Sequence, residues 1–340
     1  MIDRLIADAA RSLRGIKAGN PRFEAELLLA RALERPRVFL FIHPEYRPRV
    51  SEHAAFAELL GRRLSGEPLQ YVLGTAAFRN LTLRVGPGVL IPRSETEVLV
   101  GIAWKALHPR LGQAPPGAEV GQRSPGPRPE ADPTGGRGNP PPPWVIDVGI
   151  GSGAILLALL DEARAEAAAE AGPLDAPGAG TPRADPPFLP LGIDASPVAL
   201  RYTIMNAELN HLTRPHLVCG DLLSAFSAVD PGAPVAAIVS NPPYVSTAEM
   251  AALPPEIREH EPGTALDGGP DGLDVIRELL DQTLAFIGRG ALLCFEMGAD
   301  QEEAVRRELG HRGLLDQATV HPDLAGRPRV VLVTPIRPPR

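Results

Sequence analysis

Cysteines are scarce in this sequence, and long apolar runs are missing from it. Its 340 residues include two cysteines, Cys219 and Cys294, each within an apolar segment typical of a strand. We expect both to be buried structural thiols, because so few cysteines give no disulfide framework and fit a cytoplasmic protein. No apolar run reaches the roughly 18 residues that a membrane-spanning helix needs. The N-terminus also lacks the basic-then-apolar order of a secretory signal.

Basic residues are outnumbered, since 34 Lys and Arg against 41 Asp and Glu give a net charge of −7. Proteins that hold nucleic acids usually present a basic face, because the release of counterions supplies much of their affinity. The acidic balance therefore disfavours direct nucleic-acid binding, although a local basic patch would be compatible with it. The eight histidines show no pair at metal-ligand spacing, so we expect no metal site.

Residues 1–75 have the apolar periodicity of helices and predict a small all-helical domain. Asn20 and Pro21 are typical of a helix start, as the N-cap and the first helical position. Ser51 is a candidate cap for a later helix. The apolar period then shortens to two, which predicts a β-hairpin linker over residues 76–89.

From residue 90 to 340 the pattern alternates between strands and helices. Seven apolar stretches are typical of strands, near Trp144, Leu191, His216, Ala236, Ala291, Ala318 and Val330. This α/β alternation predicts a mostly parallel, Rossmann-like seven-stranded sheet. Two segments, 112–143 and 163–190, interrupt it. We interpret them as flexible surface insertions without a catalytic role, because they hold too little apolar surface to offset their ordering entropy.

The first strand runs into a glycine-rich turn, DVGIGSG at residues 147–153. Glycines permit sharp turns and let a ligand approach the backbone. The next helix, expected from Ala154 to about Leu160, directs its free N–H groups toward that ligand. The spacing G-x-G-x-G differs from the dinucleotide fingerprint, and the Gly-Lys-Ser/Thr ending of a phosphate loop is absent. An adenosyl-amino-acid cofactor fits best, with a tight turn that binds nothing as the alternative.

Two further strand ends are expected at the same edge of the sheet. Asp194 ends the second strand, where an acidic side chain accepts hydrogen bonds from ribose hydroxyls. Asp221 and Leu222 follow the third strand and are placed to contact an adenine, with an ordinary capped turn as the alternative. Together these strand ends predict a crevice for an adenosyl ligand.

The fourth strand is followed by Asn241, Pro242, Pro243 and Tyr244. The two prolines are rigid and remove two N–H donors. This leaves the Asn241 side-chain oxygen and the Pro242 carbonyl as acceptors, beside the flat ring of Tyr244. Such a site suits a planar NH2 group, a poor nucleophile that two acceptors would orient for methyl transfer. The motif does not choose between a glutamine amide and an amino group of a nucleobase.

The glycine turn and the Asn-Pro-Pro-Tyr motif together resemble class I methyltransferases that act on planar nitrogens. Further blocks are more specific; they are GEPLQYVLG at 66–74, VLIPR at 89–93, ALDGGPDGL at 265–273 and DLAG at 323–326. With these blocks, nearly the whole chain apart from the two insertions resembles the HemK/PrmC family of protein-(glutamine-N5) methyltransferases.

The resemblance implies an S-adenosylmethionine-dependent enzyme that methylates the glutamine of the Gly-Gly-Gln loop in peptide chain release factors. The N-terminal helical domain would help to bind this partner. Implied cofactor contacts are Asp147, Gly149, Ile150, Gly151, Ser152, Gly153, Asp194, Asp221, Leu222 and Asn241. The implied substrate site comprises Asn241, Pro242, Pro243, Tyr244 and Arg93, of which Asn241, Pro242 and Tyr244 carry the catalysis. No oligomeric state follows from the sequence, and a monomer is the working expectation.

The chain departs from the family pattern in two places. Ser94 stands where the family commonly has proline; with Glu97 it would form a Ser-x-x-Glu capping box that starts the same helix. Leu222 stands where a larger aromatic residue is often found, which weakens the expected adenine contact.

Two rival substrates remain beside release factors. One is a glutamine of a large-subunit ribosomal protein, which would need the same chemistry. The other is an amino group of DNA or RNA, against which stand the acidic balance and the lack of a separate basic recognition region. A scaffold without activity is disfavoured, because the glycine turn and Asn241 are both intact.

Overall fold

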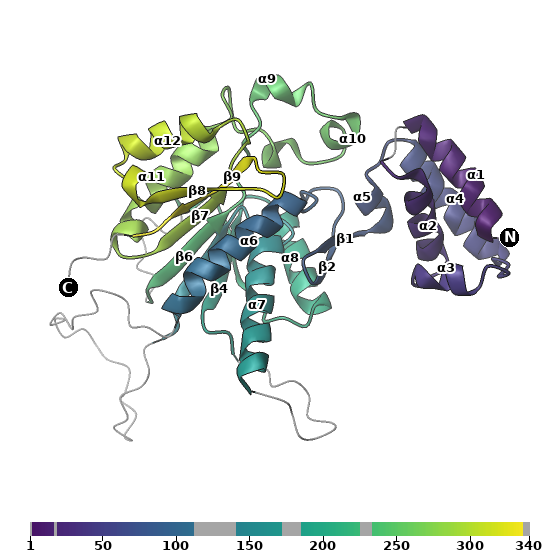
Figure 1. Cartoon of the computed structure of the whole chain (residues 1–340), viewed down its shortest axis with the longest axis horizontal. Coiled ribbons are helices and arrows are strands. Elements are labelled where there is room, and N and C mark those ends of the chain that lie inside the picture. Colours follow the sequence, from purple (N-terminus) through teal and green to yellow (C-terminus); the bar gives the residue numbers. More distant parts are fainter. Residues whose placement is uncertain (1, 17–18, 112–140, 172–184, 225–232, 336–340) are drawn as a thin grey trace.

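The protein consists of a group of short helices and an α/β unit, joined by a β-hairpin (Figure 1). The structure is a computed structural model that describes residues 2–16, 19–111, 141–171, 185–224 and 233–335. Among these residues, no helix is long and apolar enough to cross a membrane. Residues 112–140 and 172–184 of the two predicted insertions lie outside the described residues, so the flexibility of the insertions stays a prediction.

The N-terminal helices share a core of their own. They are α1 (Ile2–Leu13), α2 (Pro21–Ala32), α3 (Val38–Ile42), α4 (Val50–Leu64) and α5 (Leu69–Leu73), with a 3₁₀ turn at Arg14–Ile16. Their apolar stripes meet around Leu13, Leu28 and Leu29, which are fully buried. Helices this short are marginal alone in water, so this shared burial is what stabilises them.

The predicted cap of α4 is wrong, whereas the predicted start of α2 is confirmed. Helix α4 begins one residue before Ser51, and the Glu52 carboxylate accepts a hydrogen bond from the Arg49 N–H at 2.7 Å. A carboxylate in the first turn satisfies a free N–H and also suits the helix dipole. In α2, Asn20 Oδ1 accepts from the N–H of Phe23 at 3.2 Å.

The linker is a two-stranded antiparallel hairpin of β1 (Thr75–Phe78) and β2 (Leu81–Arg84). Phe78, Leu81 and Leu83 are buried, while alternate residues are exposed. This alternation is the period of two that predicts strands in the sequence. The expected β-hairpin is confirmed, although its strands span residues 75–84 and not the predicted 76–89.

The α/β unit is built on a seven-stranded sheet with the order β5-β4-β3-β6-β7-β9-β8. The strands are β3 (Trp144–Val148), β4 (Leu189–Asp194), β5 (His216–Cys219), β6 (Val235–Ser240), β7 (Leu292–Glu296), β8 (Ala318–Pro322) and β9 (Pro328–Val333). All neighbouring pairs from β5 to β7 are parallel, and β9 runs antiparallel to both β7 and β8. The predicted fold class, a mostly parallel Rossmann-like sheet of seven strands, is confirmed.

Helices cover both faces of this sheet (Figure 1). They are α6 (Ser94–Leu107), α7 (Ala154–Ala171), α8 (Pro197–Leu209), α11 (Asp274–Gly288) and α12 (Glu302–His311), with 3₁₀ turns at His108–Arg110, Gly263–Ala265 and Leu315–Gln317. The short helices α9 (Thr247–Met250) and α10 (Pro255–Arg258) have no buried residues and belong to neither core. Helices α6 and α7 pack on one face and α11 and α12 on the other.

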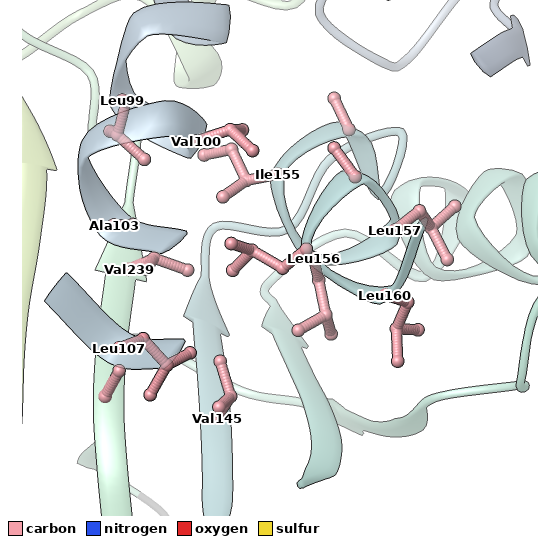
Figure 2. Packing of buried hydrophobic residues seen from close by; sticks show 14 of the residues in the cluster. Leu99, Val100, Ala103, Leu107, Val145, Ile155, Leu156, Leu157, Leu160 and Val239 are labelled. Atoms are coloured by element: carbon pink, nitrogen blue, oxygen red, sulfur yellow. The ribbon is translucent and has the colours of Figure 1, made fainter. Parts of the chain in front are cut away.

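Side chains alternate between the two cores along each central strand. Val145 of β3 and Val239 of β6 contact the α6 and α7 side, where Leu99 and Leu156 meet them (Figure 2). Ile146 belongs to the core under α11. Val145 in β3 and Ala237 and Val239 in β6 therefore face α6 and α7, and by the same alternation Asp147 points to that side.

The expected boundaries of the second insertion are wrong at both ends. Helix α7 does not stop near Leu160 but continues to Ala171, and strand β4 already begins at Leu189. Residues 163–171 are mostly Ala and Glu, which are strong helix formers and extend a helix that is already nucleated.

The two cysteines differ in burial. Cys294 in the central strand β7 is buried, as expected, and burial strongly raises the pKa of its thiol. Cys219 is exposed, so its expected burial is wrong. Strand β5 lies at the edge of the sheet, where fewer neighbours cover a side chain.

Candidate active site

The glycine turn and the Asn-Pro-Pro-Tyr segment leave neighbouring strands at the same edge of the sheet. Strands β3 and β6 are parallel, with Val148 opposite Ser240. The Ser240 hydroxyl donates to the Val148 carbonyl at 2.7 Å, with Ser240 buried. A ligand at the turn is therefore next to a group held beyond β6. The two loops lie as the sequence analysis requires.

The turn at residues 149–153 has the backbone that its glycines predict. Gly149, Gly151 and Gly153 all have positive φ angles, of 73°, 56° and 85°, a region that other residues rarely adopt. A side chain on Gly149 would meet no atom within 4 Å, whereas one on Gly153 would come within 2.9 Å of Leu157. The first glycine thus leaves room at the sheet edge, and the third allows α7 to pack.

Asp194 ends β4 and ties the turn to the next strand. Its Oδ2 accepts from the Gly151 N–H at 2.9 Å, and its Oδ1 accepts from the Ser196 N–H at 2.8 Å. Each carboxylate oxygen retains a further lone pair, and the side chain is only partly buried, so ribose hydroxyls can reach it. Burial raises the pKa of Asp194, although the hydrogen bonds from these two N–H groups act to lower it.

Asp147 lies beneath the turn and is fully buried. Its Oδ2 accepts from the Leu156 N–H at 3.1 Å, while Oδ1 has no hydrogen-bond partner in the described part of the chain. Burial raises the pKa of Asp147 to about 7. A buried acceptor without a donor costs free energy, and a ligand that carries a cationic amino group would supply one. The turn therefore fits a cofactor of the adenosyl-amino-acid type.

Asp221 and Leu222 follow β5 at the same edge, where the Gly220 N–H donates to the Asp194 carbonyl at 3.1 Å. Leu222 has a positive φ of 44°, and the Asp221 side chain is exposed. The next N–H, of Leu223, is held by Gln282 Oε1 at 2.6 Å. Both residues thus lie beside the end of β4, which carries Asp194.

The expected substrate residues come together around one small pocket of about 50 Å³. It is lined by Leu90, Arg93, Asn241, Pro242, Pro243, Tyr244, Val245, Ala265 and Leu266. Arg93 lies far from the others in the sequence, and the fold brings it to them.

Glu261 holds the Arg93 segment, and the sequence analysis missed it. Its Oε1 accepts from Arg93 Nη2 at 2.6 Å, and its Oε2 accepts from the Ile91 N–H at 3.1 Å. The Glu261 side chain is buried. No local pattern marks this glutamate, because its partners lie about 170 residues away in the sequence.

The predicted capping box at Ser94 is wrong. Helix α6 begins at Ser94 itself, whose hydroxyl donates to the Glu95 carboxylate at 2.9 Å. Glu97 accepts instead from the N–H of Arg79 in the hairpin at 3.0 Å. Because the Glu97 carboxylate binds Arg79 of the linker, it does not cap the start of α6 as the local motif predicts.

Thr96 and Glu296 also join the site and were missed. Glu296 ends β7 and is fully buried; its carboxylate accepts from the Tyr244 hydroxyl at 2.9 Å and from the Thr96 hydroxyl at 2.7 Å. Asn241 Nδ2 donates to Thr96 Oγ1 at 3.1 Å. Burial raises the pKa values of both Glu296 and Tyr244. An acidic residue at the end of an apolar strand was the one available signal.

Within the described residues, no cluster of His, Cys, Asp and Glu is arranged to hold a metal ion. The acidic side chains of the site are instead bound to backbone N–H groups, hydroxyls or Arg93. The site is thus organised by hydrogen bonds.

Comparison with known proteins agrees with this geometry. Residues 4–74 match the family model described as the PrmC N-terminal domain. The release factor glutamine methyltransferase of Moorella thermoacetica is 34% identical over 333 residues, which cover 96% of each chain. The chain belongs to the release factor glutamine methyltransferase family. The relative from Geobacter sulfurreducens is also 34% identical, over 92% of this chain and 89% of its own.

Membership of the release factor glutamine methyltransferase family confirms the resemblance to HemK/PrmC enzymes. The Caulobacter vibrioides relative, with the same name, is 33% identical over 92% of this chain and 89% of its own length. Among solved structures, the hMettl16 catalytic domain is 14% identical, with a TM-score of 0.48 over 79% of this chain and 81% of that one. That distant likeness says nothing about substrate.

Proposed function

We propose that this chain transfers the methyl group of S-adenosylmethionine to the side-chain amide nitrogen of a glutamine in a peptide chain release factor. The observation that carries the proposal is the pairing of Val148 with Ser240, which puts the glycine turn beside Asn241. Relatives that share about a third of the sequence are named for this reaction. The rival substrates, a ribosomal protein and a nucleobase, lack such support.

The cofactor would occupy the crevice at the strand ends. Its amino acid part would lie against the turn 149–153 and Asp147, its ribose hydroxyls against Asp194, and its adenine near Asp221 and Leu222. S-adenosylmethionine supplies an electrophilic methyl group on a sulfonium centre. The chain itself supplies shape and fixed acceptors, which are most effective where water is excluded.

The substrate glutamine would enter the small pocket beside Arg93 and Tyr244. Asn241 Oδ1 and the Pro242 carbonyl would accept the two hydrogens of its NH2 group. An amide nitrogen is a poor nucleophile because its lone pair is delocalised into the carbonyl. Two fixed acceptors orient that lone pair toward the methyl donor, so catalysis relies on position and electrostatics. No covalent enzyme intermediate is needed.

The protein partner would contact more than the pocket. A release factor presents its glutamine on a loop. The helices α1–α5 would bind a second region of the release factor, away from this loop. We assign the reaction to the cytoplasm, where translation termination takes place, and expect a monomer to suffice.

The test is a labelling assay with purified protein and radiolabelled S-adenosylmethionine. We expect label on a release factor, and loss of label when the glutamine of its Gly-Gly-Gln loop is changed to alanine. A ribosomal-protein fraction and duplex DNA serve as competing substrates in parallel reactions. Label on either of these, with none on the release factor, would refute the proposal.

A further inference from the structure

The side chain of Asn241 is connected by hydrogen bonds to Thr96 and, through it, to Glu296, neither of which lines the substrate pocket. Its Nδ2 donates to Thr96 at the start of α6, and Thr96 donates to Glu296 at the end of β7. Glu296 is fully buried and Thr96 is 3% exposed. Buried polar groups of this kind cannot exchange partners with water, so the arrangement is fixed.

The direction of these bonds decides how the Asn241 amide is turned. A hydroxyl has one hydrogen, and an ionised carboxylate can only accept. Burial raises the pKa of Glu296, whereas the hydrogen bonds from Thr96 and Tyr244 and the positive charge of Arg329 act in the opposite direction and favour the ionised carboxylate. The Thr96 hydrogen is used on Glu296. Thr96 Oγ1 therefore offers only lone pairs to Asn241, and only the NH2 end of the amide can meet it. The oxygen end is left as the acceptor for the pocket that Asn241 lines.

The opposite orientation would be nearly equal in shape, since the two ends of an asparagine amide differ by little more than their hydrogens. A half-turn would present the NH2 group of Asn241 to the NH2 group of a substrate amide. Two donors form no hydrogen bond with each other. The substrate would then lose one of its two acceptors.

We propose that Thr96 and Glu296 are positioning residues that lock the Asn241 amide with its oxygen toward the substrate. The inference rests on the proposed function in one respect: it takes the substrate group to be an NH2. The same Glu296 carboxylate also accepts from Tyr244 at 2.9 Å. One buried group therefore orients both the acceptor and the aromatic wall of the pocket.

The kinetic test compares Thr96→Val with Thr96→Ser. Valine keeps the shape of threonine but removes the hydroxyl, whereas serine keeps the hydroxyl. We expect Thr96→Val to lower kcat by roughly 10- to 100-fold, which is less than the roughly 100- to 1,000-fold loss when a group that contacts the reacting atoms is removed. KM for the release factor and the Kd of S-adenosylmethionine should change less than about threefold, a small part of that loss. Thr96→Ser should stay near the wild-type rate.

Two further variants provide comparisons for the turnover of Thr96→Val. Asn241→Ala removes the acceptor itself, so Thr96→Val should approach its turnover without falling below it. Glu296→Gln can both donate and accept, so it permits either amide orientation and should give an intermediate rate. Wild-type turnover of Thr96→Val or of Glu296→Gln would overturn the role of that residue. Equal losses for valine and serine, in step with a lower melting temperature, would indicate a purely structural role.

A spectroscopic test needs no substrate. The chain has only six asparagines, so selective ¹⁵N-asparagine labelling gives few side-chain NH2 signals, and Asn241→Asp identifies the pair that belongs to Asn241. In the wild type this pair should exchange slowly with solvent. In Thr96→Val its exchange should be at least about tenfold faster, while Thr96→Ser keeps it slow. Unchanged exchange in Thr96→Val would overturn the lock.

The two tests separate the inference from the proposed function. If wild-type protein leaves every release factor unlabelled, the proposed function fails, and the exchange measurement still decides whether the lock exists. If the wild type labels a release factor and Thr96→Val labels it equally fast, the lock fails alone.

Discussion

A single carboxyl group, Asp147, is the residue whose burial has the clearest consequence for stability. It lies fully buried below the glycine turn, and only one of its oxygens has a partner among the described residues. Because burial disfavours the charged form, its pKa rises from 3.8 to about 7. The folded protein therefore keeps a proton there that the unfolded chain loses at lower pH.

This difference predicts that stability falls as pH rises from about 4 to about 7. In that window the unfolded chain ionises at Asp147 while the folded protein does not, so unfolding releases a proton. The contribution of protonated Asp147 to the free energy of unfolding is complete below about pH 4 and is lost once the pH passes the pKa of the folded protein. The loss is about 4 kcal/mol at most. Urea unfolding of wild type and Asp147→Asn across this range measures it.

The Asp147→Asn variant isolates the effect, since its amide does not titrate. Burial shifts Asp194 and Glu296 in the same direction, so only the difference between the two proteins belongs to Asp147. We expect the free energy of unfolding of the wild type to fall relative to that of Asp147→Asn as the pH rises from about 4 to about 7. Parallel curves for the two proteins would show that the Asp147 pKa is ordinary.

Some residues of the site could be predicted from local sequence motifs, and others could not. Asn241 and the three turn glycines stand in short motifs whose geometry follows from backbone chemistry. Thr96, Glu261 and Glu296 are single residues whose partners lie far away in the chain. Their roles exist only once α6, β7 and the segment after α10 are packed together.

At the scale of elements, the segment 265–273 supports the loop that carries the Asn-Pro-Pro-Tyr motif. The Val245 N–H donates to the Leu266 carbonyl at 2.9 Å, and the Gly268 N–H donates to the Val245 carbonyl at 2.8 Å. A side chain on Gly268 would come within 2.8 Å of the Pro243 carbonyl oxygen. The glycine is required because two backbone segments meet there.

Gly268→Ala should therefore displace the Pro243 loop and disturb the pocket. Because the close atoms are backbone, relief needs a shift of the main chain, which costs roughly 1–3 kcal/mol. We expect methylation to fall by at least tenfold, with a lower melting temperature. The matched control is Gly263→Ala, whose added carbon would lie 3.8 Å from the nearest atom, in Met250. Equal behaviour of the two variants would contradict this role for Gly268.

The ends of elements were the least predictable feature at this scale. The start of α2 followed from Asn20 and Pro21, because capping is a local interaction. The extension of α7 to Ala171 is explained by the helix-forming Ala and Glu residues there, but the N-terminal contacts of α6 did not follow from its local motif. In α6 the expected capping carboxylate of Glu97 binds the hairpin at Arg79 instead, a contact that no window of sequence contains.

At the scale of the whole molecule, the helical part and the α/β unit are joined by more than the hairpin. Tyr71 of α5 packs with Val85 and Val89 and donates to the Val89 carbonyl at 2.5 Å. Its neighbour Val72 packs into the helical core. Helix α5 thus belongs to both parts, and an ion pair of Arg63 with Glu256 at 3.2 Å adds a second link.

Breaking this second link should change substrate binding but not chemistry. In Glu256→Gln, Arg63 keeps its buried partner Glu24 at 2.8 Å. The Glu256 side chain is 45% exposed, so stability should change by less than about 1 kcal/mol. We expect KM for an intact release factor to rise about two- to fivefold, a size typical of one weak contact, with kcat unchanged. Steady-state kinetics and thermal melting measure both quantities.

The matched control is Glu259→Gln, which removes a nearby exposed carboxylate whose one ion pair among the described residues is with its neighbour Arg258. It should leave KM unaltered. A fall in kcat for Glu256→Gln, or the same KM change in the control, would count against a role of this link in holding the partner.

The sequence by itself determined the order and type of the main elements, the sheet class and the glycine turn, and it predicted the acceptor role of the Asn-Pro-Pro-Tyr motif. These depend on apolar period and on backbone chemistry within a few residues. Only the tertiary structure decided that β3 and β6 are neighbours in register, that Arg93 reaches the pocket, and that Thr96 and Glu296 stand behind Asn241. The physical reason is that hydrogen bonds and burial act through space, between residues whose separation along the chain carries no signal.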